Sequence, residues 1–388
     1  MITISLAIGK YTCIIIGSRA FLLPISGAPL VKQEEWSDRG SLIVEFAQAN
    51  PEILVEVKPA RNKAAPAPQT VQDTGASANL LEDITIKILF VRGEQSLYEL
   101  TRELGLSFAV VNEIFDRLRR EQFVEVKGMT GLAYRTALTD RGRSRALELL
   151  SLNQYAGHAP VSLKEYTSRV QAQSITKAEV PRGGLQQALA HLVLEAPTLK
   201  RLGTAVVSGA SILLYGPAGT GKTSIAEVLP SAYGDCVWIP YAIEVFGQII
   251  TVYDSGIHQK LHEGQRQDDD GRWVLCRRPR VIVGGELTIK MLDLLFDPVG
   301  KLYAAPVQMK ANNGVLIVDD FGRQLVRPEA LLNRWIVPLD RGIDFLTLGG
   351  GKKFEIPFDL FLVFASNLEP AQLGDEAFLR RALRTRSK

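Results

Sequence analysis

The hydrophobic pattern of the 388-residue chain changes near residue 203. From there on, short apolar runs, ILLY (212–215), VLIV (315–318) and LFLVFA (360–365), alternate with segments whose apolar residues recur at helical spacing. Uninterrupted apolar runs of this length are typical of strands buried on both faces, as in parallel sheets covered by helices. The pattern predicts a three-layer α/β sandwich with a mainly parallel sheet over residues 203–388.

Residues 80–152 show a different rhythm, with three amphipathic segments, two alternating segments and a final amphipathic segment. Ser96, followed three residues later by Glu99, is typical of a helix N-cap with a capping box. The alternating segments FVEVKGM and LAYRTALT flank a Thr-Gly turn and predict a β-hairpin. The order of these elements predicts a small winged helix-turn-helix domain that precedes the sandwich.

The remaining segments are less regular. Residues 57–79 are rich in Ala, Pro and small polar residues and predict a linker, and residues 153–202 predict a helical lead-in to the sandwich. Residues 1–56 form a segment of uncertain status, apolar at its start but interrupted by Lys10 and Arg19. We expect neither a membrane span nor a signal peptide there, because no long charge-free run exists and no charge precedes the apolar core. An appendage or a misassigned start codon is the favoured interpretation of the first 30 residues.

Charge favours neither nucleic acid nor a membrane as the main partner. The net charge is +3, from 45 basic and 42 acidic residues, and residues 81–150 hold 11 of each sign. Because phosphate contacts drive DNA affinity, this balance favours a protein contact for the winged-helix segment and leaves DNA open as the less favoured alternative. The three cysteines, Cys13, Cys236 and Cys276, form no CxxC pair and fit a reducing cytoplasm.

The sequence ILLYGPAGTGKTSIAEVL (212–229) contains the pattern G-x-x-x-x-G-K-[ST] between a predicted strand and a predicted helix. In such a loop the backbone N–H groups surround phosphate oxygens, the lysine reaches the β- and γ-phosphates, and the hydroxyl ligates Mg²⁺. A tight glycine-rich turn without a ligand is the alternative. We expect Pro230 to end the following helix early. The predicted nucleotide-binding residues are Gly216, Pro217, Ala218, Gly219, Thr220, Gly221, Lys222 and Thr223.

Two further apolar strands end in polar residues. GVLIVDDF (314–321) ends in Asp319 and Asp320, and FDLFLVFASN (358–367) ends in Asn367. Ligands of open α/β sheets bind at the carboxyl ends of strands. We therefore expect Asp319, with Thr223, near Mg²⁺, and expect Asp320 and Asn367 near the attacking water and the γ-phosphate. An acidic turn and an ordinary turn asparagine are the alternatives.

These motifs, followed by DEAFLRR (375–381), resemble the AAA+ ATPases in both type and order. The combination GPAGTGKT, LIVDDFGRQ, LLNRWIVPLDRG, FASNLEP and DEAFLRR is similar to a bacterial group of predicted AAA+ ATPases with chaperone activity. The resemblance implies a Walker A motif at Gly216–Thr223, a Walker B motif at Asp319–Asp320, and sensor 1 at Asn367. It also implies arginine fingers at Arg380 and Arg381, which act on a neighbouring subunit of a ring, commonly a hexamer.

The sequence departs from this family in three ways. The second Walker B carboxylate is Asp320, where most members have Glu. Lys222 and Asp319 are 97 positions apart, which leaves room for an insertion, and residues 262–283 predict a hairpin with a solvated acidic tip at Asp268–Asp270. The helical lid that follows the arginine fingers in the family is expected to be missing.

Three features are interpreted conservatively. FLTLGGGKKFEIPF (345–358) predicts a hairpin with glycines at its tip, not a second phosphate loop. His258 and His262 have a metal-compatible spacing but no third ligand, which favours a core or solvated pair. Arg334 is either a surface helix residue or a contact to a neighbouring subunit.

The sequence therefore predicts a cytoplasmic, ring-forming ATPase that binds ATP with Mg²⁺ and remodels an unidentified protein. A nucleotide-responsive DNA-binding regulator is one alternative. A truncated nucleotide-binding module without turnover is the other.

Overall fold

A computed structural model describes residues 3–8, 11–16, 19–24, 60–61, 64–131, 133–178, 180–181, 183–190, 192, 194, 196–209, 211–261 and 269–373. The chain forms two compact units, Met1–Ala60 and Arg61–Lys388, which are described separately. In the first unit, three strands form an antiparallel sheet in the order β1-β2-β3. They are β1 (Thr3–Ile8), β2 (Tyr11–Ile16) and β3 (Arg19–Pro24). Strand β4 (Ala60–Arg61) spans the boundary between the units.

The second unit contains the predicted parallel sheet. Its strand order is β14-β17-β20-β9, and each neighbouring pair is parallel. The strands are β14 (Arg280–Val283), β17 (Val315–Val318), β20 (Phe361–Ser366) and β9 (Ile212–Tyr215). Strand β20 thus lies between the strand of the glycine-rich loop and the strand of the two aspartates. All four strands run in the same direction, so their carboxyl ends meet at one edge.

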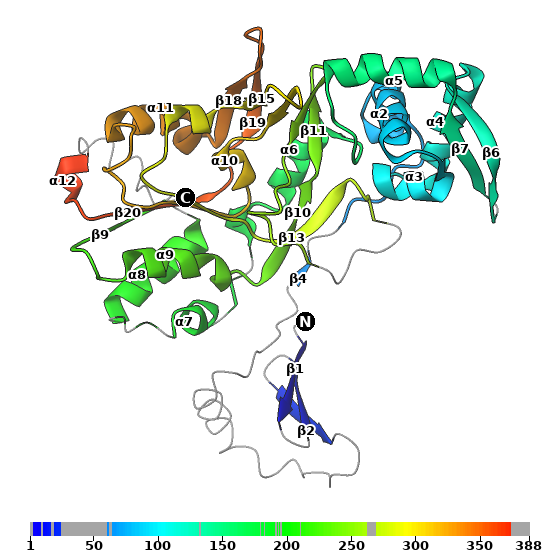
Figure 1. Ribbon diagram of the computed structural model, residues 1–388. Coiled ribbons are helices and arrows are strands. Elements are labelled where there is room, and N and C mark those ends of the chain that lie inside the picture. The colour runs from blue at the N-terminus through cyan, green and yellow to red at the C-terminus, as the bar shows by residue number, and fades with distance from the viewer. Residues whose placement is uncertain are drawn as a thin grey trace. The chain divides into compact units, whose positions relative to one another are not determined.

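Helices cover both faces of this sheet, as predicted (Figure 1). On one face, Ile317 and Val363 pack against α8 (Ala196–Ser208), α9 (Lys222–Val228) and the 3₁₀ helix η4 (Leu229–Ala232). On the other face, Leu316, Leu362 and Phe364 pack against Trp335 of α11 (Pro328–Arg341). Each face thus has its own apolar core. Shorter helices complete this region: η3 (Ile175–Lys177), α7 (Gly184–Ala188) and α12 (Pro370–Leu373).

Apart from β14, most of the stretch between α9 and β17 contributes to a β-rich layer that also includes β8, and this layer accounts for the long separation of the two motifs. One of its sheets has the order β15-β16-β12-β11-β8, and in another β10 pairs with β13. The elements are β8 (Val161–Ser162), β10 (Asp235–Pro240), β11 (Ala242–Val245), β12 (Gln248–Thr251), β13 (Trp273–Arg277), η5 (Ile289–Leu292), β15 (Leu295–Asp297), β16 (Leu302–Ala304) and α10 (Val307–Lys310).

The two hairpins predicted over residues 262–283 and 345–358 have different outcomes. The hairpin over 345–358 is confirmed: β18 (Ile343–Thr347) pairs antiparallel with β19 (Lys353–Pro357). For the acidic segment, Lys260 pairs with Cys276 as in a hairpin. The expectation of a solvated tip is wrong for Asp270, which is buried against Arg272. Asp268 lies outside the described residues.

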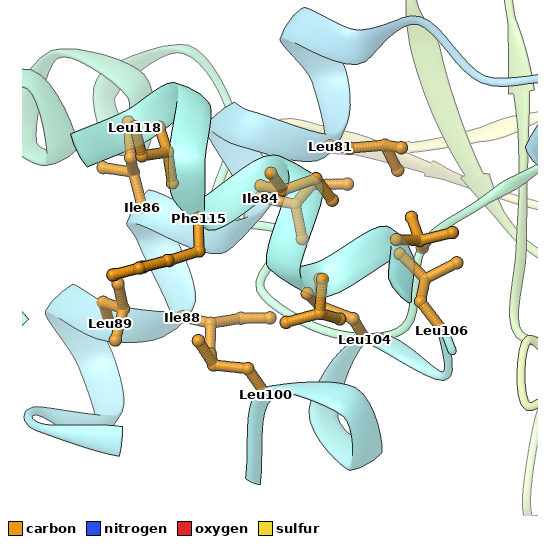
Figure 2. Close-up of a cluster of buried hydrophobic side chains, with 14 of the residues drawn as sticks. Leu81, Ile84, Ile86, Ile88, Leu89, Leu100, Leu104, Leu106, Phe115 and Leu118 are labelled. Atoms are coloured by element: carbon orange, nitrogen blue, oxygen red, sulfur yellow. The ribbon is translucent and has the colours of Figure 1, made fainter. Parts of the chain in front are cut away.

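The elements predicted over residues 80–152 are present in the predicted order. They are α2 (Ala78–Arg92), β5 (Gln95–Ser96), α3 (Leu97–Leu104), α4 (Phe108–Arg120), β6 (Val124–Thr130), β7 (Ala133–Leu138) and α5 (Asp140–Leu152). The capping box of Ser96 and Glu99 is confirmed. Figure 2 shows the core that holds these helices, in which Phe115 and Leu118 of α4 face Ile86 and Leu89 of α2.

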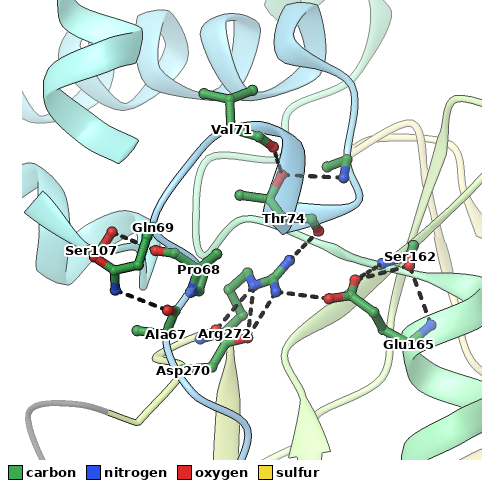
Figure 3. A network of polar contacts seen from close by, with 11 residues as sticks. Ala67, Pro68, Gln69, Val71, Thr74, Ser107, Ser162, Glu165, Asp270 and Arg272 are labelled. Atoms are coloured by element: carbon green, nitrogen blue, oxygen red, sulfur yellow. Dashed lines mark hydrogen bonds and ion pairs between the residues drawn. The ribbon is translucent and has the colours of Figure 1, made fainter. Parts of the chain in front are cut away.

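A buried arginine, Arg272, ties Thr74 and Glu165 to the β-rich layer (Figure 3). Arg272 is 1% exposed and donates to Asp270, to Glu165 and to the carbonyl oxygen of Thr74. Glu165 belongs to α6 (Leu163–Ala172), where it forms a capping box with Ser162. Thr74, within the predicted linker, therefore contributes a backbone acceptor to a buried ion-pair network.

A second buried polar network lies at the amino ends of the parallel strands. Arg278, just before β14, pairs with Asp235 and donates to the carbonyl oxygens of Gln173 and Asn313. Asn313, just before β17, bonds Asp359, just before β20. The network joins the sheet to the β-rich layer at the edge opposite the carboxyl ends.

The structure also bears on the cysteines and on the question of a membrane-spanning helix. Cys236 and Cys276 are buried thiols on the paired strands β10 and β13, and burial raises the pKa of Cys276 to about 12. No helix among the described residues has the length and apolar character needed to cross a membrane.

Lys87 of α2 gives the first prediction. Burial lowers its pKa from 10.5 to about 8, against the opposing charge of Asp83, and its Nζ donates to Asn153 Oδ1. The unfolded chain keeps this proton to a higher pH than the folded chain, so stability rises with pH across that window. We expect Lys87→Met to reduce this rise in urea unfolding between pH 8 and 10.5. Lys200→Met, at an exposed position, is the matched control; equal slopes in all three proteins would contradict the prediction.

Candidate functional site

The glycine-rich loop connects β9 to α9 and has the backbone conformation that its sequence predicts. Gly216 and Gly221 have φ of 146° and 79°, a region that side chains disfavour. Helix α9 begins at Lys222. The early end expected from Pro230 is confirmed, since α9 stops at Val228 and continues as η4 with the proline in its first turn.

The Lys222 side chain curls back into this loop. Its Nζ lies 2.9 Å from the carbonyl oxygen of Gly216 and 2.8 Å from that of Pro217. Thr220 Oγ1 also donates to Pro217 O, at 2.9 Å. The carbonyl oxygens of Gly216 and Pro217 thus hold a positive charge inside the turn, where a phosphate group would find both a cation and backbone donors.

Thr223, in the first turn of α9, contacts the end of strand β17. Its Oγ1 lies 3.1 Å from both carboxylate oxygens of Asp319. A hydroxyl and a carboxylate are oxygen ligands of the kind Mg²⁺ prefers, and Mg²⁺ sites commonly combine one or two carboxylates with substrate phosphates and water. These two residues therefore fit a magnesium ion delivered with a nucleotide. Among the described residues, no cluster of three or more His, Cys, Asp or Glu side chains forms a separate metal site.

Asp320 and Asn367 also lie together, at the carboxyl ends of β17 and β20. Asn367 Nδ2 donates to Asp320 Oδ1 at 3.1 Å, and the Asp320 side chain is exposed. Asp320 has φ of +48°, an uncommon value for a residue other than glycine. Asp320 and Asn367 thus contact each other directly, from the ends of neighbouring parallel strands.

The segment after β17 is fastened to β20 by residues that the sequence analysis missed. Phe321 N donates to Ala365 O at 2.7 Å, and Ser366 Oγ donates to Phe321 O at 2.6 Å. Gln324 Nε2 donates to Asp319 O at 2.7 Å. The local sequence offered no clear signal for these roles: a serine beside Asn367 and a glutamine five residues after Asp319 are ordinary at strand ends.

Other candidate residues lie elsewhere. Arg380, Arg381 and His262 are outside the described residues. His258 is a core residue: its Nδ1 accepts from Asp254 N and its Nε2 contacts Lys310 O, and burial lowers its pKa.

Arg334 is also engaged within the chain. It lies on α11 and forms ion pairs with Asp344 and Asp293. Its side chain thus connects α11 to β18 and to the segment before β15, and it is satisfied without a contact from outside the chain.

Gly322 lies in the turn that follows β17 and allows a test of how tightly this turn is packed. Its φ is +101°, and a Cβ atom there would lie 2.7 Å from Leu368 Cδ1 and 2.9 Å from Leu373 Cδ2. We expect Gly322→Ala to lower the free energy of unfolding by about 1–3 kcal/mol, measured by urea denaturation. Gly93→Ala is the control, because Gly93 has φ of +80° but no atom near its Cβ position. An equal loss in both variants would contradict the packing argument.

Comparisons with known proteins add little to this geometry. No protein-family model and no curated protein match the chain. Similar solved structures include NtrX from Brucella abortus (13% identity, 51% of this chain, 38% of that chain, TM-score 0.29). NtrX from Brucella abortus in complex with ATP has 13% identity over 51% of this chain and 40% of that chain, with a TM-score of 0.28. The complex between subunits BchI and BchD of magnesium chelatase, based on a cryo-EM reconstruction, has 16% identity over 54% of this chain and 59% of that chain, with a TM-score of 0.30. The chain thus spans less than two thirds of each. By its loop, strand order and helix layers, the sheet β14-β17-β20-β9 with α8, α9 and α11 is an α/β sandwich of the P-loop NTPase type.

Proposed function

We propose that this protein is an AAA+ ATPase that binds ATP with Mg²⁺ and hydrolyses it. The observation that carries the proposal is the contact between Thr223 and Asp319, which are 96 positions apart in the chain. The fold brings the hydroxyl of the glycine-rich loop to the first carboxylate of the LIVDD strand. A loop that served only as a turn would not require this partner.

The binding role belongs to the loop and the start of α9. The backbone N–H groups of Gly216 and of Ala218–Thr223 would donate to phosphate oxygens, and the Lys222 ammonium would leave its loop carbonyls to contact the β- and γ-phosphates. The Lys222 ammonium would exchange neutral carbonyl acceptors for anionic phosphate oxygens, and hydrogen bonds between two charged groups are stronger than those to a neutral acceptor. Thr223 and Asp319 would hold Mg²⁺, which neutralises the charge of the phosphates.

The hydrolytic role belongs to Asp320 and Asn367. The Asp320 carboxylate orients a water molecule, whose oxygen forms the new bond to the γ-phosphorus while the bond to the β–γ bridging oxygen breaks. The water proton passes to solvent or to phosphate, and ADP and inorganic phosphate leave. Asn367 holds the Asp320 carboxylate and, with nucleotide bound, contacts the γ-phosphate.

The use of the ATP energy is inferred from the resemblance to the chaperone-like group. We propose that Arg380 and Arg381 complete the site of a neighbouring copy in a ring, and that the assembly remodels a protein partner in the cytoplasm. The region over 78–152 is the proposed docking module, with the order of elements of a winged helix.

The charge distribution on α4 favours a protein over DNA as the ligand of this module. The exposed positions of α4 include Arg119 and Arg120, but also Glu113 and Asp116. DNA affinity depends on an excess of cations over anions along the contact surface. A DNA-reading regulator therefore remains the alternative with less support.

Two substitutions test the site directly. We expect Lys222→Ala to abolish ATP binding, and Asp320→Asn to retain binding but lower turnover by ~10²–10⁴-fold. Binding is measured by calorimetry and turnover by phosphate release. Lys200→Ala and Asp340→Asn, at exposed positions on α8 and α11, are matched controls. Equal turnover in the wild type and Asp320→Asn would refute the role of Asp320.

If Arg380 and Arg381 act as arginine fingers, the specific ATPase activity depends on protein concentration. Specific ATPase activity should rise with protein concentration, because assembly brings Arg380 and Arg381 to a neighbouring site. Arg381→Ala should lower turnover by up to ~10³–10⁵-fold without loss of ATP binding. Arg201→Ala, at an exposed position on α8, is the control. Bound ATP with flat, near-zero activity at every concentration would instead support the module without turnover.

A further inference from the structure

The backbone around Asp320 is held by the side-chain amide of Gln324. Its Nε2 donates to the carbonyl oxygen of Asp319 at 2.7 Å, and its Oε1 accepts from the N–H of Gly322 at 2.8 Å. One amide group therefore bridges the peptide group before Asp320 and the peptide group after Phe321. Since one contact needs a donor and the other an acceptor, a carboxylate or an apolar side chain of similar size could not make both.

The segment 319–322, which Gln324 bridges, contains a backbone conformation that needs support from its surroundings. Asp320 has φ of +48°, and residues held in sparsely populated regions persist only where the surroundings over-determine them. Arg323 N donates to Asp320 O at 2.9 Å and closes the same turn. The amide of Gln324 thus stabilises a turn whose backbone aims the Asp320 side chain.

Residues at the end of β20 also help to fix the direction of the Asp320 side chain. Asn367 Nδ2 contacts Asp320 Oδ1, and Phe321 is bonded on both sides to Ala365 and Ser366. The turn is therefore clamped from two directions, by β20 on one side and by Gln324 on the other. Loss of the Gln324 bridge would release only one of these clamps, so the fold would survive while the carboxylate lost its fixed position.

We propose that Gln324 is a positioning residue that fixes the Asp320 carboxylate for ATP hydrolysis. The inference rests on the proposed function and adds a residue to it. Gln324 is assigned no contact with nucleotide or magnesium: it acts through the backbone of residues 319–322. Its removal should therefore affect the rate of the chemical step and leave nucleotide affinity unchanged.

The experiment compares Gln324→Glu and Gln324→Ala with the wild type as full-length proteins. We expect kcat to fall by ~10- to 100-fold in both, because small misplacements of a catalytic group have effects of this size. The Kd for ATP with Mg²⁺ should stay at the wild-type value. Gln69→Glu is the control: the Gln69 amide also bonds a backbone carbonyl, that of Ala67, but at an exposed position elsewhere. A wild-type kcat in both variants, or a loss of ATP binding that parallels the loss of kcat, would overturn the inference.

A double variant separates positioning from a general effect on the structure. If Gln324 acts through Asp320, then Gln324→Glu added to Asp320→Asn should cause no further fall in kcat. A full multiplicative fall would overturn the inference. Failure of the proposed function would look different, because the wild type itself would then show no turnover with ATP and Mg²⁺.

Discussion

The architecture depends on the common direction of four parallel strands, which gives their two ends different chemistry. At the amino ends, Arg278, Asn313 and Asp359 precede β14, β17 and β20 and bond one another or shared partners. At the carboxyl ends, Asp319 and Asn367 follow β17 and β20 beside the glycine-rich loop. The amino ends are joined to the β-rich layer by buried hydrogen bonds, which fixes the strands along their length and relative to one another. The edge formed by the carboxyl ends can then carry polar side chains at defined positions, because the buried hydrogen bonds at the amino ends stabilise the sheet.

The buried network is stabilising only because its groups satisfy one another. A buried charge without a partner costs several kcal/mol, roughly 3–5 when one partner of a pair is removed. Arg278 has Asp235 and two backbone carbonyls, and Arg272 has Asp270, Glu165 and Thr74 O. Both arginines lie in the sequence between the two nucleotide motifs. Both arginines also donate beyond the β-rich layer, Arg278 to Gln173 O and Asn313 O and Arg272 to Glu165 and Thr74 O, so buried hydrogen bonds join the layer to its neighbours although it interrupts the motifs in sequence.

The sequence predicts the features that depend on neighbouring residues. The loop at 216–223, the buried strands and the capping box of Ser96 each follow from a short pattern, and the structure contains them. The β-rich layer does not follow from such patterns, because β8 pairs with β11 and β12 with β16 across long stretches of chain. Asp270 shows the same limit. Three consecutive acidic residues indicate a solvated turn. Asp270 is buried instead because it pairs with Arg272, whose remaining hydrogen bonds go to Thr74 and Glu165, far away in the sequence. The roles of Gln324 and Ser366 depend in turn on the path of the backbone after β17, which residue types alone do not specify.

The backbone at Asp320 also accounts for the main departure from the AAA+ pattern. Asp320 has φ of +48°, and Asp and Asn enter this region more readily than other residues because their short polar side chains can hydrogen-bond locally. Here the Asp320 side chain accepts from Asn367, and its N–H donates to Asp319 Oδ1. Glutamate in this conformation would place a longer, more flexible side chain on a strained backbone. The shorter carboxylate is therefore the residue that this turn accommodates.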